Sequence, residues 1–140
     1  MDASYPVLKA VTPEAKQALQ RESIVIREFP FRIGREARFA LVHGTLRSAE
    51  KRSRSQPPNN DIYLIDRGEL LNISREHCQI EQMADDAFEV LDRGSTCGTV
   101  VDGQEIGGDK AVSRCALKPG STIVLGMADS PFVFEFAVPA

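Results

Sequence analysis

Three short clusters of polar residues have the chemistry of an anion-binding site. They are the pair Gly34-Arg35, the run Ser74-Arg75-Glu76-His77 and the run Gly94-Ser95-Thr96-Cys97-Gly98-Thr99. A phosphate ester offers three acceptor oxygens and about two negative charges, so a receptor needs a guanidinium, hydroxyl donors and backbone N–H groups that converge. The clusters together contain this set of groups. The sequence therefore predicts one site that takes a phosphate ester.

The segments between the clusters have the patterns of short β-strands. Apolar and polar residues alternate over 23–29, 77–83, 87–91 and 131–137, and in the last run Phe132, Phe134 and Phe136 would share one face. Residues 100–106 indicate a hairpin, because Asp102-Gly103 suits a tight primed turn. We therefore predict an all-β fold, a sandwich of two antiparallel sheets. One short helical turn is expected at 12–19, where Thr12 can cap and Pro13 fits the first helical position.

The predicted strands indicate where the clusters lie. Arg35 follows an apolar run and is expected just where a strand ends, while Ser74 and Arg75 should lie on the loop that enters the next strand. Residues 95–99 form the turn after the strand at 88–92. The donors converge if these three loops meet at one end of the sandwich.

Composition favours a single domain that spans residues 1–140, with 1–4 flexible. The chain has 140 residues, of which 42% are hydrophobic, which is enough for a core without disulfides or metal. The three cysteines have no C-x-x-C spacing, so we predict no disulfide framework, no metal site and no cofactor. We find no leader and no apolar run near the roughly 20 residues of a membrane span. The expectation is a cytoplasmic protein with a native start at Met1 and no membrane partner.

Positive charge is concentrated in one segment. Residues 35–54 hold six basic and two acidic residues, a net charge of +4. Because the whole chain has a net charge of −3, the remaining residues have a net charge of −7. An acidic body argues against nucleic acid as a partner and favours a local site for a negative group. We predict an extended basic loop over 36–58 that either supplements the site with charge or is simply solvated.

Five motifs in order give the chain a family resemblance. They are Gly34-Arg35, Asn60-Asp61-Ile62, Ser74-Arg75-x-His77-x-x-Ile80, Asp92-x-Gly94-Ser95-Thr96-x-Gly98-Thr99-x-Val101-x-Gly103 and Leu117-x-x-Gly120-x-x-Ile123-x-Leu125-Gly126. Together they resemble the forkhead-associated (FHA) domain family, from about Tyr5 onward. The resemblance implies a non-catalytic sandwich that binds phosphothreonine peptides through its apical loops. The partner would be a phosphothreonine-containing protein, either a kinase substrate or a kinase.

The resemblance also assigns roles to single residues. Arg35 and Ser74 would contact the phosphate, and Arg75 and Thr96 would add phosphate or peptide contacts. The shape of the binding loops would depend on Gly34, Gly98 and a buried, hydrogen-bonding His77.

Cys97 departs from the family pattern at a peptide-contacting position. The family usually has Asn there, whose side chain bonds the peptide backbone, whereas a thiol is a weak donor and a weak acceptor. Loss of one hydrogen bond of about 0.5–1.5 kcal/mol would weaken peptide binding by up to roughly tenfold.

Two other functions compete with phosphopeptide binding. An enzyme would use Cys97 or Ser74 as a nucleophile and His77 as its base, but the chain has none of the usual hydrolase, phosphatase or P-loop motifs. The second alternative keeps the fold and binds another protein without phosphate, as an assembly domain. The polar set of Arg35, Ser74, Arg75 and Thr96 favours phosphopeptide binding over both.

Overall fold

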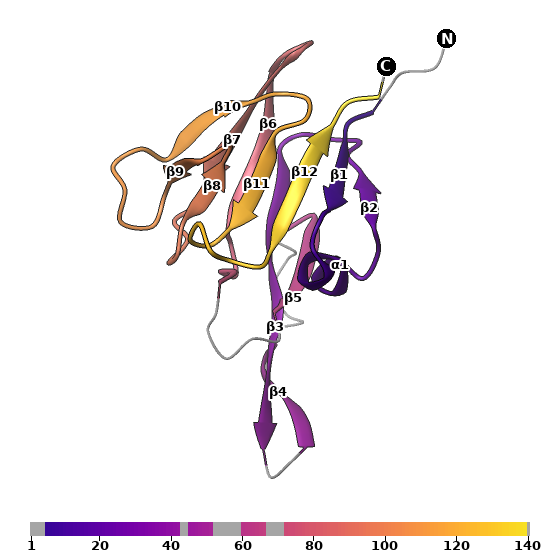
Figure 1. The fold of residues 1–140 in the computed structure, drawn as a ribbon, viewed down its shortest axis with the longest axis vertical. Coiled ribbons are helices and arrows are strands. Elements are labelled where there is room, and N and C mark those ends of the chain that lie inside the picture. The colour runs from indigo at the N-terminus through magenta and orange to yellow at the C-terminus, as the bar shows by residue number, and fades with distance from the viewer. Residues whose placement is uncertain (1–4, 43–44, 52–59, 67–71, 140) are drawn as a thin grey trace.

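The described part of the protein is a sandwich of two β-sheets with one short helix (Figure 1). The computed structural model describes residues 5–42, 45–51, 60–66 and 72–139, with the backbone alone over 36–42 and 45–51. One sheet has the strand order β2-β1-β12-β11-β8-β9, and the other has the order β10-β7-β6-β3-β4 with β5 added on β3. The strands are β1 (Val7–Ala10), β2 (Ser23–Val25), β3 (Phe31–Val42), β4 (Thr45–Lys51), β5 (Ile62–Asp66), β6 (Cys78–Ala84), β7 (Ala87–Asp92), β8 (Thr99–Val101), β9 (Gln104–Ile106), β10 (Arg114–Leu117), β11 (Thr122–Leu125) and β12 (Val133–Ala137).

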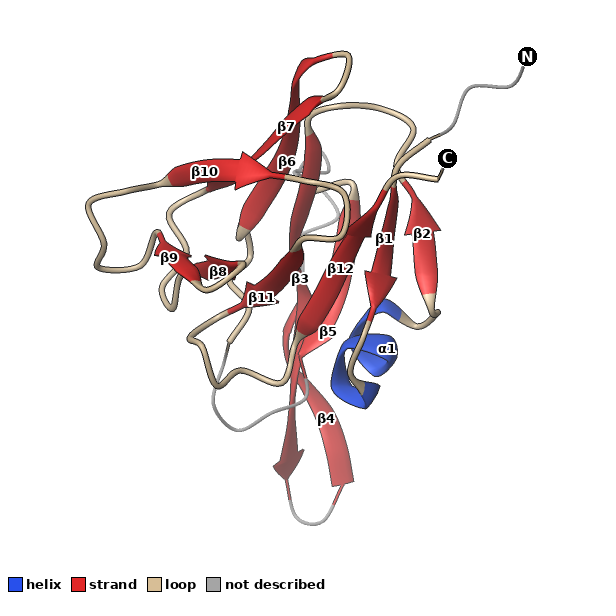
Figure 2. Cartoon of the chain, turned by 45° about the horizontal axis from the view of Figure 1, so that its top comes forward, coloured by secondary structure: helices blue, strands red, loops and turns tan. Residues whose placement is uncertain are grey.

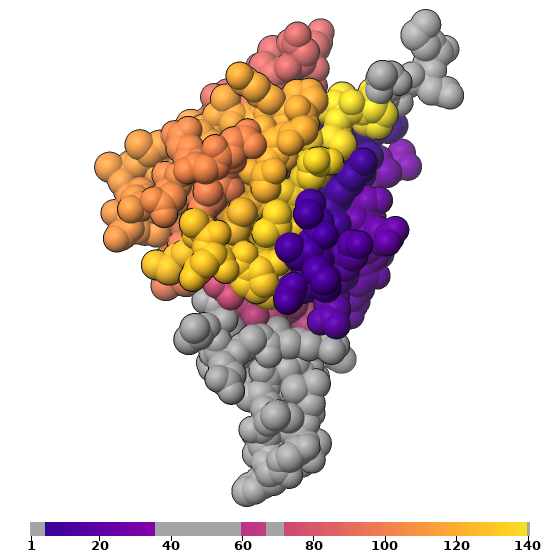
Figure 3. All heavy atoms as spheres, viewed as in Figure 1, coloured from indigo at the N-terminus to yellow at the C-terminus, as the bar shows by residue number. Residues whose placement is uncertain are grey.

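The predicted fold class is confirmed. Among the described strands, β3 and β5 form the parallel pair and all the other pairs are antiparallel. The first and last strands of the chain, β1 and β12, lie side by side, and their segments form one continuous face in Figure 3.

The core fills the space between the two sheets. The alternation predicted for β12 is present, because Phe132, Phe134 and Phe136 are all buried. The Phe136 ring meets Phe88 of β7 edge to face, with ring centroids 5.0 Å apart, an arrangement that aromatic pairs prefer. This contact joins the two sheets across the core.

The helix α1 (Pro13–Leu19) begins where the sequence predicts. The Thr12 hydroxyl accepts a hydrogen bond from the Ala15 N–H at 3.2 Å, and Pro13 occupies the first helical turn. Buried Ala15, Ala18 and Leu19 attach the helix to the core, and Figure 2 shows it beside β1 and β5. Within the part of the chain that the structure describes, no helix has the length and apolar character to cross a membrane.

The predicted hairpin over 100–106 is also present, between β8 and β9. Asp102 and Gly103 have φ angles of 50° and 84°. Both angles are positive, as a primed two-residue turn requires.

The prediction of a loop over residues 36–58 is wrong for its first part. β3 continues to Val42 and pairs with β4, with Leu41 opposite Leu46 and Ala40 opposite Arg47. The strand persists because its partner changes from β6 to β4 on one side while β5 pairs on the other. Residues 43–44 and 52–59 lie outside the described residues.

Arg35 therefore does not lie at a strand end. It lies inside the 12-residue β3, between the pairing of Ile33 with Cys78 of β6 and the pairing of Ala37 with Lys51 of β4.

Candidate anion-binding site

The first cluster meets the second in the gap between β6 and β4. The Arg35 N–H donates to the Ser74 carbonyl at 3.0 Å, and the Arg35 guanidinium Nη1 donates to the Ile73 carbonyl at 2.7 Å. Arg35 is only 8% exposed. Arg35 of β3 thus holds Ile73 and Ser74, which precede β6, through one main-chain and one side-chain hydrogen bond.

The second cluster meets the third through Ser74. Its hydroxyl oxygen accepts a hydrogen bond from the Thr96 N–H at 3.0 Å. The Thr96 and Arg75 side chains are exposed, and Ser74 is half-buried between them and the core. The structure therefore brings Arg35, Ser74 and Thr96 into one hydrogen-bonded cluster with a solvent-facing side.

His77 joins the two loops from below. It is fully buried, its Nδ1 accepts from the Ser74 N–H at 3.0 Å, and its Nε2 lies 2.8 Å from the Gly98 carbonyl. Since Nδ1 accepts, the ring proton is on Nε2 and donates to Gly98. Burial lowers the pKa of His77 below its usual value, against the opposing effects of the Gly98 carbonyl and Asp92. His77 is a neutral bridge, and its engaged nitrogens do not suit the catalytic base of the enzyme alternative.

Asp92 organises the third cluster, a role that the sequence interpretation missed. Its Oδ1 accepts from the N–H groups of Gly94 and Ser95 at 3.0 and 2.8 Å, and its Oδ2 accepts from the Ser95 and Thr99 hydroxyls at 2.6 and 2.8 Å. The Ser95 hydroxyl in turn accepts from the Gly98 N–H at 2.9 Å. The sequence Asp92-Arg93-Gly94-Ser95 is a signal for such a turn and would have indicated this role.

Asn60 fixes the main chain at Arg75. Its Nδ2 donates to the Arg75 carbonyl at 2.7 Å, and its Oδ1 accepts from Arg93 Nη1 at 2.5 Å. Arg93 also donates to Glu76 at 2.9 Å. A Cβ at Gly34 would overlap the Arg75 carbonyl and the Asn60 side chain. Close approach of β3 to this loop therefore requires Gly34.

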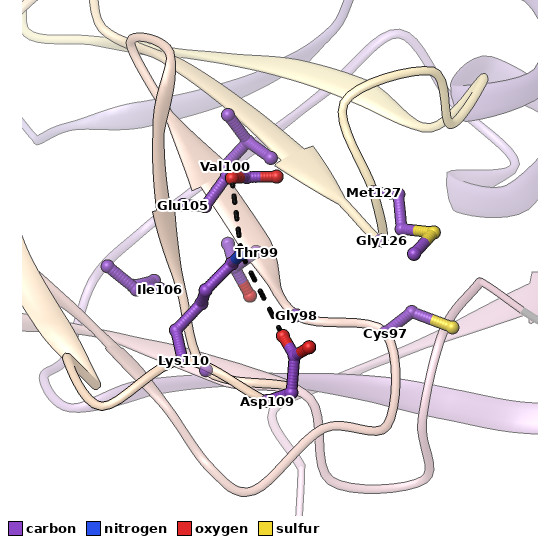
Figure 4. A pocket seen from close by; sticks show the side chains of 11 residues that line it. Cys97, Gly98, Thr99, Val100, Glu105, Ile106, Asp109, Lys110, Gly126 and Met127 are labelled. Carbon is purple, nitrogen blue, oxygen red and sulfur yellow. Dashed lines mark ion pairs between the residues drawn. The ribbon is translucent and has the colours of Figure 1, made fainter.

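A small pocket begins beside Thr96, at Cys97. Figure 4 shows the sulfur-bearing side chains of Cys97 and Met127 on one side and Lys110 on the other. The Lys110 ammonium lies 3.6 Å from Glu105 and 3.9 Å from Asp109. The pocket thus has an apolar wall next to the anion site. No cluster of His, Cys, Asp or Glu suited to a metal ion occurs among the residues described.

Comparison with known families agrees with this fold. The model of the FHA domain family matches residues 31–126 of the chain. The chain belongs to the FHA domain family. FHA domains are non-catalytic modules that generally bind phosphothreonine. The comparison with curated proteins gave no significant match.

Solved structures of FHA domains share the architecture. The FHA domain of the CT664 protein from Chlamydia trachomatis matches with a TM-score of 0.61 and 19% identity, covering 98% of this chain and 100% of that one. The kinase-interacting FHA domain of kinase-associated protein phosphatase in Arabidopsis matches with a TM-score of 0.60 and 16% identity, covering 100% and 98%. Mycobacterium tuberculosis EmbR, solved with a low-affinity phosphopeptide, matches with a TM-score of 0.59 and 20% identity, covering 99% of this chain and 26% of that one. At these low identities, the structural matches show a shared fold.

The buried neutral His77 makes folding stability depend on pH. As the pH falls below about 6.5 the unfolded chain takes up a proton on this ring, while the folded chain resists protonation because its pKa is lower. The contribution of His77 to the free energy of unfolding is therefore fully present above about pH 6.5. It is lost progressively as the pH falls from 6.5 toward the lower pKa of the folded state. We expect a slope of up to about 1.4 kcal/mol per pH unit in this window, measured by urea unfolding at a series of pH values.

Two variants separate His77 from the other titrating groups. His77→Gln should flatten the slope, and His43→Gln, which changes the other histidine of the chain, should not. If His77→Gln does not fold, NMR titration of the wild-type ring resonances gives the same information. A His77 ring that titrates at or above pH 6.5 in the folded protein would contradict the assignment.

Gly107 is expected to be essential for the geometry of the Asp92 turn. A Cβ at Gly107, where φ is +70°, would overlap the Asp92 carboxylate, whereas a Cβ at Gly103, where φ is +84°, meets no atom within 4 Å. Gly103→Ala should therefore cost only backbone strain, about 1 kcal/mol, and Gly107→Ala should cost at least about 1–3 kcal/mol more. Chemical denaturation measures both, and equal losses would show that Asp92 tolerates the added methyl group.

Proposed function

We propose that the chain binds phosphothreonine on a partner protein, in signalling that depends on a Ser/Thr kinase. The observation that carries this proposal is the hydrogen bond from the Thr96 N–H to the Ser74 hydroxyl, with Ser74 held by Arg35 from β3. It supports one receptor built from the three clusters. Family membership supports the same function, and the match to EmbR concerns a protein solved with a phosphopeptide.

The proposed contacts differ in character. The Ser74 hydroxyl would donate its proton to a phosphate oxygen while it accepts from Thr96. Exposed Arg75 and Thr96 would contact phosphate or peptide from the rim. Arg35 would act from beneath, because its charge lies in a buried position where electrostatic attraction is less screened than in water.

The proposed contact is reversible. A micromolar dissociation constant corresponds to about −8 kcal/mol, a reasonable scale for a signalling interaction. The partner would be a kinase or a substrate of that kinase.

Removing the Ser74 hydroxyl should weaken phosphopeptide binding selectively. A hydrogen bond to a charged group contributes about 1.5–3 kcal/mol, so Ser74→Ala should lower affinity by about tenfold to a hundredfold. Arg35→Ala should also abolish most binding, and Arg75→Ala should cost less because this side chain is exposed. Fluorescence anisotropy with a degenerate phosphothreonine library beside its unphosphorylated counterpart measures each effect.

Ser23→Ala provides a matched control, because Ser23 is an exposed serine on the edge strand β2. This variant should bind like the wild type. Equal binding of the two libraries by the wild type would refute phosphate recognition and favour the phosphate-independent assembly function.

Changing Cys97 to the residue usual in the family should strengthen peptide binding. Cys97 is half-buried on the same loop as Thr96, and an Asn there can bond the peptide backbone. One additional hydrogen bond predicts an affinity gain of about two- to tenfold for Cys97→Asn. Titration of Cys97→Ala with the same phosphopeptides provides the control, which should show no gain. Unchanged or weaker binding by Cys97→Asn would show that position 97 does not contact the peptide.

A further inference from the structure

The sheet that contains β1 and β12 has an outer face on which most side chains are valine. Paired residues on neighbouring strands point to the same side of a sheet, and successive residues alternate. The pair Leu8 and Phe136 is buried in the core, so the pairs on either side of it point outward. The outward valines are Val7, Val11, Val25, Val124 and Val133, and each is partly or largely exposed. An outer face of an antiparallel sheet is usually polar.

The outward side chains form three rows across the strands. The two outer rows are apolar and consist of Val25, Val7 and Ala137 in one row, and of Val11, Val133 and Val124 in the other. Lys9 and Glu135 are opposite each other in the row between them. Among the ion pairs of the described residues, none includes Lys9 or Glu135. The centre of this valine face therefore has one cation beside one anion, with an apolar row on each side.

The outer face of the other sheet is different. Glu81 of β6 is opposite Glu89 of β7, and Arg114 of β10 lies 3.3 Å from the first carboxylate and 2.9 Å from the second. These charges compensate one another within the chain, as suits a surface in contact with water. A contiguous apolar patch on a soluble protein indicates a site of interaction. In Figure 3, β1 and β12 of the valine face lie at the front surface of the molecule.

We propose that the valine face binds a second copy of this chain, face to face, about a twofold axis that is parallel to the strands and lies between β1 and β12. Rotation about this axis exchanges the positions of the two strands. Lys9 then faces Glu135 of the partner subunit, and Glu135 faces Lys9 of the partner subunit. The same rotation brings Val7 onto Ala137 of the partner subunit and Val11 onto Val133 of the partner subunit. A patch that is complementary to itself in this way is what a twofold interface requires.

The size of the face predicts a weak dimer. Strands are about 4.8 Å apart, and rows two residues apart are separated by about 7 Å. The four strands β2, β1, β12 and β11 and the three rows therefore cover about 20 by 20 Å, or about 400 Å² per copy. Stable complexes bury about 800 Å² per partner. We therefore expect a reversible dimer that forms at high protein concentration.

The same axis places the two candidate anion sites at one end of the dimer. β11 ends and β12 begins at the end of the sheet where the Gly126 N–H donates to the Gly98 carbonyl at 2.9 Å, beside the third cluster. A rotation about an axis parallel to the strands keeps this end of both copies on the same side. If the proposed function holds, the dimer presents two phosphothreonine sites to one partner. The dimer itself does not depend on that function.

The test is sedimentation velocity of the chain without any peptide, at concentrations from about 10 μM to about 1 mM. Lys9→Glu gives the centre of the face two carboxylates, and Glu135→Lys gives it two ammonium groups. The variants also include the double exchange Lys9→Glu with Glu135→Lys. Val11→Asp places a charge in an apolar row where the side chain is 52% exposed, and its control is Met83→Asp, on the other sheet at 53% exposure. Circular dichroism verifies that each variant is folded.

We expect the wild type to dimerise as its concentration rises. Each single charge reversal should weaken the dimer by at least about tenfold, because like charges then face each other. An equal mixture of Lys9→Glu and Glu135→Lys should form a mixed dimer, and the double exchange should restore the dimer. Val11→Asp should also weaken the dimer by at least about tenfold, and Met83→Asp should leave it unchanged.

A chain that stays monomeric at every concentration would overturn the proposal. A dimer that ignores the charge reversals, or a mixture of the two reversed variants that forms no dimer, would show that the copies meet through another surface. If the chain is monomeric and Val11→Asp weakens phosphopeptide binding while Met83→Asp does not, the valine face belongs to the phosphorylated partner instead. Failure of the proposed function appears only in the comparison of phosphorylated and unphosphorylated peptides, so the two failures are distinguishable.

Discussion

The candidate site depends on one buried carboxylate, that of Asp92. A charged group away from water is costly unless hydrogen bonds compensate it. Asp92 accepts three from the turn that follows β7 and a fourth from Thr99 at the start of β8. Those bonds fix Ser95, whose hydroxyl binds the Gly98 N–H, while the Gly98 carbonyl receives the proton of His77. His77 then holds the Ser74 N–H. The position of Ser74 is therefore set by a series of hydrogen bonds that begins at Asp92, the last residue of β7.

This chain of hydrogen bonds makes the site a prearranged one. Ser74 and the turn that contains Thr96 are held in place by His77 in the core below them, before any ligand is bound. Binding loses less free energy when the receptor is already in its binding shape. The same arrangement makes the site sensitive to changes that are buried and distant from any ligand, such as those at Gly107, whose backbone lies against the Asp92 carboxylate.

Local features of the fold could be predicted from the sequence, and non-local ones could not. Some features depend on only a few adjacent residues, so the sequence pattern predicts them. They are the buried phenylalanines around Phe134, the Asp102-Gly103 turn and the Thr12 cap. The course of β3 past Arg35 depends on three partners that replace one another along the strand. Its charged residues also hide the alternation that marks a strand. Likewise, the hydrogen bond from Arg35 to Ile73 joins residues 38 positions apart.

The turn over residues 94–99 contains residues that maintain its shape and residues that face outward. Ser95 and Gly98 point their hydrogen-bonding groups inward and are buried, whereas Thr96 is exposed and Cys97 is half-buried beside the pocket. A substitution at Ser95 or Gly98 would therefore disturb Asp92 or His77 and with them Ser74. A substitution at Cys97 leaves these bonds intact. The departure from the family pattern, at position 97, therefore falls on a residue outside the hydrogen bonds that connect Asp92, Ser95, Gly98 and His77.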